Sequence, residues 1–149
     1  MNYTAREDYG LRAVLDLAEH ATHTPLQSKD IAARQGIPEQ FLEQLLGALR
    51  RGGLVRSVRG ASGGYHLARP ASSITVGDIL RTLSGPLTPI PCLGQGGSEM
   101  CEHGASYGVH TFWERLAAAV ETVSDGLTLQ DMLDIQLANN EQAGYMMNI

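Results

Sequence analysis

The 149-residue sequence contains few charged residues, few aromatic residues and only two cysteines. Charged residues make up 18% of the chain and form no long run of one sign, so a disordered segment is not expected. No apolar stretch reaches the length of about twenty residues that a membrane-spanning helix requires. Charged side chains are spread through the first part of the chain, which leaves no apolar centre for a signal peptide. We therefore predict a cytoplasmic protein with no membrane partner.

Sequence motifs of catalytic sites are also absent. The chain has no phosphate-binding loop, no nucleophile elbow, no pair of cysteines separated by two residues and no acid–base pair at a recognisable spacing. We therefore do not expect an enzyme. Apolar residues make up 43% of the chain, which is enough to form a hydrophobic core in a protein of one-domain size.

The net charge of −5 is divided unevenly along the chain. Residues 1–69 contain nine lysines and arginines against seven acidic residues, whereas residues 70–149 contain two against nine. The first part is therefore positive by +2 and the second part negative by −7. Because a phosphate-binding surface needs local positive charge, a nucleic-acid interface would have to lie in the first part.

A capping box marks the start of the first predicted helix. Thr4 is followed three residues later by Glu7, and apolar residues then recur at helical spacing to about Glu19. The proline-containing segment after this helix is predicted to be a loop.

Two further helices are predicted on either side of a glycine. A short helix over 29–35, with Ser28 as its N-cap, ends at Gly36, and Pro38 then opens a longer amphipathic helix over 39–51. Two helices joined by a tight glycine-containing turn are typical of a helix-turn-helix. Many small helical proteins share this arrangement, so the pattern alone does not distinguish a DNA-binding motif from a helical scaffold.

A predicted β-hairpin follows this pair of helices directly. Residues 54–58 and 65–67 alternate apolar and polar side chains, and the glycine-rich segment 59–64 forms the tip between them. A hairpin in this position is the wing of a winged helix-turn-helix. Because Arg59 stands beside these glycines, we interpret it as a DNA contact: the wing would bring its guanidinium to a phosphate or into the minor groove. The alternative is a charged residue in a solvated turn.

The second part of the chain is predicted to contain further helices and one long loop. Thr75 caps a short helix over 76–83, and a helix over 110–124 carries an apolar stripe of the kind that binds a partner or covers a core. Residues 85–108, which include both cysteines, have no helical or strand period. A loop of this length inside a compact protein usually holds a ligand or is disordered.

The C-terminus is predicted to hold one short helix and a tail. Thr128 caps a helix through Ile135, and residues 139–149 are expected to fray. The predicted fold is therefore mainly α with a small β-wing, a winged helix-turn-helix followed by a long C-terminal dimerisation helix. Its expected parts are a DNA-binding domain over 1–84, a cysteine-containing sensor loop over 85–109, and a dimerisation helix with its tail over 110–149.

Several segments in combination resemble the IscR/NsrR-type regulators, a family of dimeric winged-helix transcription factors. The resemblance rests on Tyr9, IAARQGI (31–37), FLEQLL (41–46), LRRGGLV (49–55) and VRGASGGYHL (58–67), and continues through 72–79 and Trp113. It covers nearly all of the chain, and the LEQLL segment combined with the VRG–GGY wing is specific. It implies a homodimer that binds a palindromic operator in double-stranded DNA.

The resemblance also implies which residues contact DNA. The family places its second motif helix in the major groove and its wing against the minor groove. Glutamine can pair with adenine, and glutamate can accept a hydrogen bond from cytosine N4 but is repelled by phosphates elsewhere. The alternative for Gln40 and Gln44 is that they are plain solvent-exposed residues. By position, the expected DNA-binding residues are Ser28, Gln40, Glu43, Gln44, Arg50, Arg51, Arg56, Arg59, Gly60 and Ser62.

Members of this family that sense iron or nitric oxide hold an iron–sulfur cluster with three cysteines and a histidine or carboxylate. Only two cysteines are present here. The resemblance implies a labile cluster of the 2Fe–2S type, because histidine can replace cysteine in such clusters. Its implied ligands are Cys92, Cys101 and His110, with Asp8 from the other subunit, and His103 and Tyr107 are alternative donors.

Other interpretations remain open from the sequence. Some members of the family lack the cysteines and work without a cluster, so Cys92 and Cys101 could form a thiol switch, or the chain could respond to an unidentified ligand with no cofactor. An Fe–S electron carrier would use the same cysteines but would not need a wing. A protein-interaction module built on the same helices would show no salt-dependent affinity for DNA.

Overall fold

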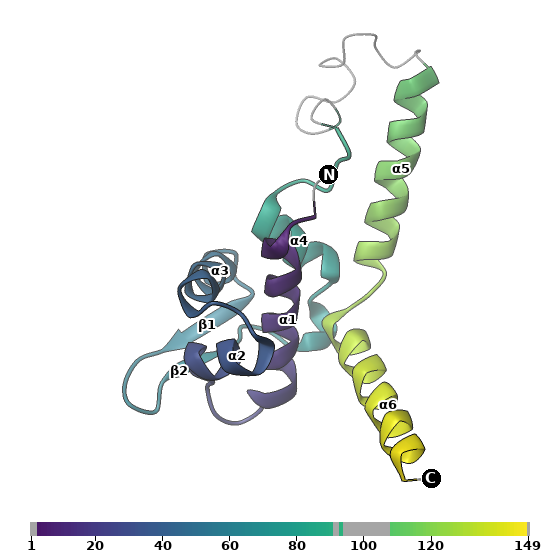
Figure 1. Cartoon of the computed structure of the whole chain (residues 1–149). Coiled ribbons are helices and arrows are strands. Elements are labelled where there is room, and N and C mark those ends of the chain that lie inside the picture. Colours follow the sequence, from purple (N-terminus) through teal and green to yellow (C-terminus); the bar gives the residue numbers. More distant parts are fainter. Residues whose placement is uncertain (1–2, 91–92, 94–107, 149) are drawn as a thin grey trace.

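The computed structural model describes residues 3–90, 93 and 108–148 (Figure 1). These residues form a mainly helical fold with one two-stranded antiparallel sheet, as predicted. In chain order the elements are α1 (Ala5–His20), α2 (Ser28–Gln35), α3 (Glu39–Arg51), β1 (Val55–Val58), β2 (Gly64–Leu67), the 3-10 turn η1 (Ala71–Ser73), α4 (Val76–Ser84), α5 (Gly108–Asp125) and α6 (Leu129–Met147). Within the described residues, no helix has both the length and the apolar character that a membrane span requires.

α1 is the central helix of the fold. α2, α3 and the wing lie on one side of it, and α5 and α6 lie on the other (Figure 1). The inner face of α1 buries Ala13, Val14 and Leu17, which pack with the leucines of α3 and with Ile79 of α4 in one core. Burying a side chain of leucine size contributes roughly 1.5–3 kcal/mol, so this shared core holds α3 firmly on the rest of the protein.

The predicted capping box at the start of α1 is present and extends to α4. The Glu7 carboxylate accepts hydrogen bonds from the backbone N–H of Thr4 (2.7 Å) and from its hydroxyl (2.6 Å), and from the hydroxyl of Ser84 at the end of α4. Burial raises the pKa of the Glu7 carboxyl group, but the hydrogen bonds from Ser84 and Thr4 outweigh burial and lower that pKa to about 2. Glu7 therefore joins the start of α1 to the end of α4.

The wing is a regular antiparallel hairpin. β1 and β2 pair from Val55 opposite Leu67 to Val58 opposite Gly64. Val55 is buried while the rest of β1 is exposed, so the hairpin is attached to the core at its base and projects at its tip. This arrangement confirms the predicted wing.

α5 is attached to the fold near its C-terminal end. Arg81 of α4 donates two hydrogen bonds to the Asp125 carboxylate (2.9 and 2.7 Å), and these bonds hold the pKa of Asp125 below its ordinary value. A side chain at position 77 would meet the Asp125 carboxylate and the Arg81 guanidinium, so Gly77 leaves room for this ion pair. Beyond this contact, much of α5 is exposed.

The C-terminal helix is longer than the sequence predicts. α6 continues to Met147, so the predicted end of the helix near Ile135 and the predicted frayed tail over 139–149 are wrong for the described residues of that segment. The first residue of α6, Leu129, is fully buried in the core and anchors the helix. Gly144 and two asparagines weaken a helix, but the glutamate, glutamine, alanine and methionine residues around them favour one and no proline interrupts it.

Candidate nucleic-acid interface and metal-ligating residues

α3 has one buried face and one exposed polar face. Its four leucines are fully buried, whereas Gln40, Glu43 and Gln44 are exposed. Residues three and four positions apart lie on the same side of a helix, so these three side chains form one polar surface. Two amides and a carboxylate in this arrangement can form hydrogen bonds with the edges of base pairs.

The turn from α2 to α3 has the geometry of a helix-turn-helix. Gly36 adopts the left-handed conformation (φ 64°, ψ 36°) that glycine tolerates best. Tyr9 of α1 packs edge-on against Phe41 of α3, with ring centroids 5.7 Å apart. The turn and this contact together set the direction in which α3 leaves α2.

Ser28 is half-buried and is the first residue of α2, not its N-cap as predicted. Gln27 occupies the N-cap position, and no side chain caps the helix. The helix starts one residue early because the Gln27 carbonyl already accepts from the backbone N–H groups of Asp30 (3.1 Å) and Ile31 (3.3 Å), and the Ser28 hydroxyl lies 3.5 Å from the Glu43 carboxylate of α3. Ser28 therefore borders the polar face of α3.

The tip of the wing exposes Arg59, Gly60 and Ser62, as a DNA-contacting wing requires. Gly60 has a positive φ of 109°, which favours glycine. A side chain at Gly63 would collide with the backbone carbonyl of Val58. The glycines therefore allow a tight tip whose backbone can approach a nucleic acid closely.

The arginines divide into paired and unpaired groups. Ion pairs with aspartates are formed by Arg12 on α1, Arg34 on α2, Arg69 after β2 and Arg81 on α4. By contrast, Arg50 and Arg51 at the end of α3, Arg56 on β1 and Arg59 on the wing are exposed and form no ion pair with the described residues. Arg50 donates only to the neutral Ser57 hydroxyl (3.4 Å). Uncompensated positive charge is thus concentrated beside the polar face of α3.

A groove between α2 and the wing adds one residue that the sequence analysis missed. The groove is lined by Gln27, Ser28, Lys29, Gly60 and Tyr65, among others, and Lys29 is exposed. Lys29 could have been identified from its position in the first turn of α2, the first helix of the helix-turn-helix. DNA phosphates commonly lie near the start of such a helix.

Two of the predicted metal ligands lie among the described residues. Asp8 is in the first turn of α1 with 68% of its side chain exposed, and its Oδ2 lies 3.1 Å from Nε of Arg12. Arg12 also donates to the backbone carbonyl of Gln35 (2.6 Å). His110 is in the first turn of α5. The remaining predicted donors, Cys92, Cys101, His103 and Tyr107, lie outside the described residues.

His110 is a buried histidine whose ring has no hydrogen-bond partner among the residues that the structure describes. Only 4% of the residue is exposed, and neither Nδ1 nor Nε2 forms a hydrogen bond with the described residues. The Glu114 carboxylate lies 3.5 Å from Nδ1 and would pair with a protonated ring. A buried polar atom without a partner costs about 1–3 kcal/mol, so the ring suits a ligand that is not provided by its neighbours. The described residues alone contain no group of three potential metal ligands.

Comparison with known proteins gives consistent matches. Residues 3–135 match the Rrf2 family, which is described as an iron-dependent transcriptional regulator. A putative HTH-type transcriptional regulator of Mycobacterium tuberculosis is 39% identical over 132 residues, which cover 89% of this chain and 81% of the relative. The HTH-type transcriptional regulator CymR of Bacillus subtilis is 36% identical over 149 residues, which cover 100% of both chains.

Two solved structures of similar proteins share the fold. The structure of CymR, described as the global cysteine regulator of B. subtilis, has a TM-score of 0.73 and covers 91% of this chain and 98% of that chain. The structure of T. potens IscR is 40% identical, has a TM-score of 0.74, and covers 91% of this chain and 88% of that chain.

Proposed function

Since this chain belongs to the Rrf2 family of DNA-binding transcription regulators, we propose that it is a homodimer that reads a palindromic operator and responds to an iron–sulfur cluster. The relatives are transcription regulators and not enzymes, as the lack of catalytic motifs predicts. The observation that supports DNA reading is the polar face of α3 beside four exposed arginines without ion pairs.

In this proposal α3 lies in the major groove and the wing lies against the minor groove. Gln40 and Gln44 pair with adenines, and Glu43 accepts from the N4 amino group of a cytosine. Arg59 contacts the minor groove or a phosphate, and the arginines at the end of α3 and on β1 bind phosphates. Phosphate contacts set the position of the protein on DNA, whereas contacts to base edges select the sequence.

The apolar face of α5 supports homodimerisation. Phe112 is 56% exposed and Val123 is 71% exposed, and Trp113, Leu116 and Val120 lie half-buried along the same stripe. A continuous apolar stripe in contact with water is unfavourable, and a second copy of α5 would cover it. A two-fold pairing of this kind relates the two α3 helices by the symmetry of a palindrome.

The proposed cluster ligands are Cys92, Cys101 and His110 of one subunit with Asp8 of the partner subunit. The residues that the structure describes fit this role, because the ring nitrogens of His110 are buried without hydrogen bonds and most of the Asp8 side chain is exposed. His110 would have to be neutral to coordinate. When bound, a 2Fe–2S cluster supplies a redox centre, and nitrogen ligands in place of thiolates raise its potential. His103 and Tyr107 are the alternative donors.

A cluster-free regulator is the second candidate. The specific observation in its favour is the match to CymR over 100% of both chains, because the solved structure of that relative is described as a cysteine regulator. In this case Cys92 and Cys101 act as redox-sensitive thiols, or an unidentified ligand carries the signal.

Selection of duplexes from a random-sequence library tests the proposed DNA reading. We expect enrichment of an inverted repeat. The logarithm of the affinity for it should fall linearly with the logarithm of the salt concentration, and the number of phosphates bound sets the slope. The protein with Gln40 and Gln44 both replaced by alanine is the matched variant, and it should lose the sequence preference. Failure to enrich any duplex would contradict the proposal.

A further inference from the structure

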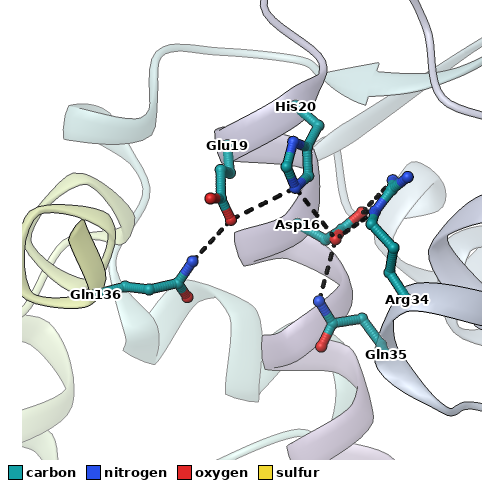
Figure 2. Close-up of polar contacts among 6 residues, drawn as sticks. All are labelled: Asp16, Glu19, His20, Arg34, Gln35 and Gln136. Carbon is teal, nitrogen blue, oxygen red and sulfur yellow. Dashed lines mark hydrogen bonds and ion pairs between the residues drawn. The ribbon is translucent and has the colours of Figure 1, made fainter. Parts of the chain in front are cut away.

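Asp16 of α1 is a buried carboxylate that binds the end of α2 (Figure 2). Its side chain is 1% exposed. Arg34 donates from Nε to Oδ1 (3.0 Å) and from Nη2 to Oδ2 (2.7 Å), and Gln35 donates from Nε2 to Oδ1 (3.0 Å). Arg34 and Gln35 are the last two residues of α2, and Gly36 then begins the turn into α3. A single carboxylate therefore holds the two residues that immediately precede this turn.

The start of α2 is held by the long Ser28 bond to Glu43 (3.5 Å) and, just before its N-cap, by the backbone bonds between Leu26 and Tyr65. Only Ile31 and Ala32 are buried among its eight residues, and no side chain caps its first turn. Burial of these two residues turns one face of α2 towards the core, but it defines the rotation of the helix less closely than directional hydrogen bonds do. The bond from Arg12 to the Gln35 carbonyl opposes sliding along the axis, because carbonyl groups at the end of a helix point along it.

The contact between Asp16 and Arg34 is a two-pronged pairing of a guanidinium with a carboxylate. Two parallel N–H···O bonds between a guanidinium and a carboxylate define both the distance and the angle between the groups. Asp16 is buried but 38% of the Arg34 side chain is exposed, and an ion pair that takes a charge out of water often adds little net stability. Its main contribution is therefore expected in the geometry of α2.

We propose that Asp16 is a positioning residue for DNA recognition, which sets the orientation of α2 and of the Gly36 turn that leads into the polar face of α3. This inference rests on the proposed reading of DNA by α3. Asp16 is buried on α1 and does not reach the exposed face of α3, so it acts only through Arg34 and Gln35.

The same turn of α1 provides a matched control. Glu19 accepts a hydrogen bond from Gln136 of α6 (2.7 Å), and Nε2 of His20 lies 3.5 Å from Glu19 and 3.8 Å from Asp16 (Figure 2). Gln136 makes no hydrogen bond to α2. Gln136→Leu therefore removes a hydrogen bond from this turn of α1 and leaves the bonds between Asp16 and α2 intact.

The test measures sequence discrimination, defined as the ratio of the Kd for a random duplex to the Kd for the in vitro selected duplex of the same length. Asp16→Asn keeps the size of the side chain but loses the charged two-oxygen acceptor. We expect discrimination to fall by about tenfold, within the range for one bidentate base contact. The Kd for the random duplex should stay within about twofold with an unchanged salt slope, because the phosphate-binding residues remain.

Two controls separate positioning from stability. Gln136→Leu and Ile79→Val, a core change on α4 that lowers stability away from α2, should both keep the discrimination of the natural protein. If Asp16 were merely structural, its loss would lower the folded fraction, both Kd values would rise together and discrimination would be unchanged. That outcome overturns the proposal. If Asp16→Asn does not fold, as judged by circular dichroism, Gln35→Ala takes its place, because it removes one of the three hydrogen bonds to Asp16. Discrimination should fall in this variant too, and unchanged discrimination overturns the proposal.

Hydrogen exchange gives a measurement that needs no DNA. The amides of Gly36 and Ile37 bond to the Ala32 carbonyl at the end of α2. These two amides should exchange faster in Asp16→Asn than in Ile79→Val when the two variants have the same global stability. The same comparison applies to Gln35→Ala where that variant is used. Equal exchange rates overturn the proposal. Failure of the library to enrich any duplex contradicts the DNA-reading function instead, and hydrogen exchange then still tests whether Asp16 holds α2.

Discussion

Leu26 and Tyr65 exchange both of their backbone hydrogen bonds. The N–H of Leu26 donates to the carbonyl of Tyr65 (2.9 Å), and the N–H of Tyr65 donates to the carbonyl of Leu26 (2.7 Å). Leu26 lies directly before the N-cap of α2, and Tyr65 belongs to β2. Gly64 permits this approach, because a side chain there would collide with the Leu26 carbonyl. The wing is therefore tied by its backbone to the helix-turn-helix.

The contribution of the wing to DNA affinity can be tested at Arg59. Arg59→Ala should weaken binding to selected and random duplexes by a similar factor and reduce the salt slope by about 1, because one phosphate contact is lost. Titration of both duplexes at several salt concentrations measures this. Arg69→Ala is the control, since Arg69 already pairs with Asp78 (3.3 Å). Unchanged affinity in Arg59→Ala would count against a DNA-contacting wing.

Dimerisation through α5 should depend on its apolar stripe. Phe112→Glu places a charge at the N-terminal end of the stripe and should convert the dimer to monomer, because a buried unpaired carboxylate is strongly unfavourable. Sedimentation equilibrium measures the mass. Ala118→Glu adds the same charge on the opposite, exposed side of α5 and should leave the dimer intact. A dimer of unchanged affinity in Phe112→Glu would place the interface elsewhere.

The proposed ligands should affect the visible absorption spectrum of protein purified without oxygen. Cys92→Ala should abolish the absorbance, because a cluster cannot be held without its thiolates. Asp8→Ala should change the spectrum without abolishing it, and His110→Ala should change it too. Asp30→Ala removes another exposed aspartate and should leave the spectrum as it is. An identical spectrum in Asp8→Ala would remove Asp8 from the ligand set.

Glu7 should make stability depend on acid pH. Its pKa of about 2 in the folded protein lies below the ordinary value of 4.5, so its contribution is fully present above about pH 4.5 and is lost as pH falls towards 2. Glu7→Gln should lower the free energy of unfolding by about 1–3 kcal/mol at pH 7, because buried hydrogen bonds to a charged acceptor weaken. Denaturant titrations at several pH values should show this difference shrinking between pH 4.5 and 2. The exposed Glu121→Gln is the control, and a difference that stays constant over that range would show that Glu7 is not the titrating group.

The elements that carry local signals could be predicted from the sequence. The capping residues Thr4 and Thr75, the glycine of the helix-turn-helix and the alternation of the wing each act over a few neighbouring residues, and the structure confirms them. The length of α6 could not be predicted in this way. Its first residue is anchored by the core, and the helix-favouring residues that follow outweigh Gly144 and the two asparagines.

Contacts between distant parts of the chain carry no comparable signal. Asp16 appears in the sequence as one more charged residue on an amphipathic helix, and its burial depends on Arg34 and Gln35 of another helix. In the same way, the burial of His110 could not be inferred from its position at the start of a helix. The polar face of α3 was easier to predict, because helical spacing alone places its three residues together.

The effect of bound iron on DNA affinity decides between the two proposed modes of regulation. Protein purified without oxygen is titrated with its selected duplex before and after a chelator has removed the iron. A regulator that responds to its cluster should show Kd values that differ by about 5- to 150-fold, the usual range for coupling between two sites. Equal Kd values, or protein that contains no iron as purified, would contradict cluster sensing and favour the cluster-free regulator.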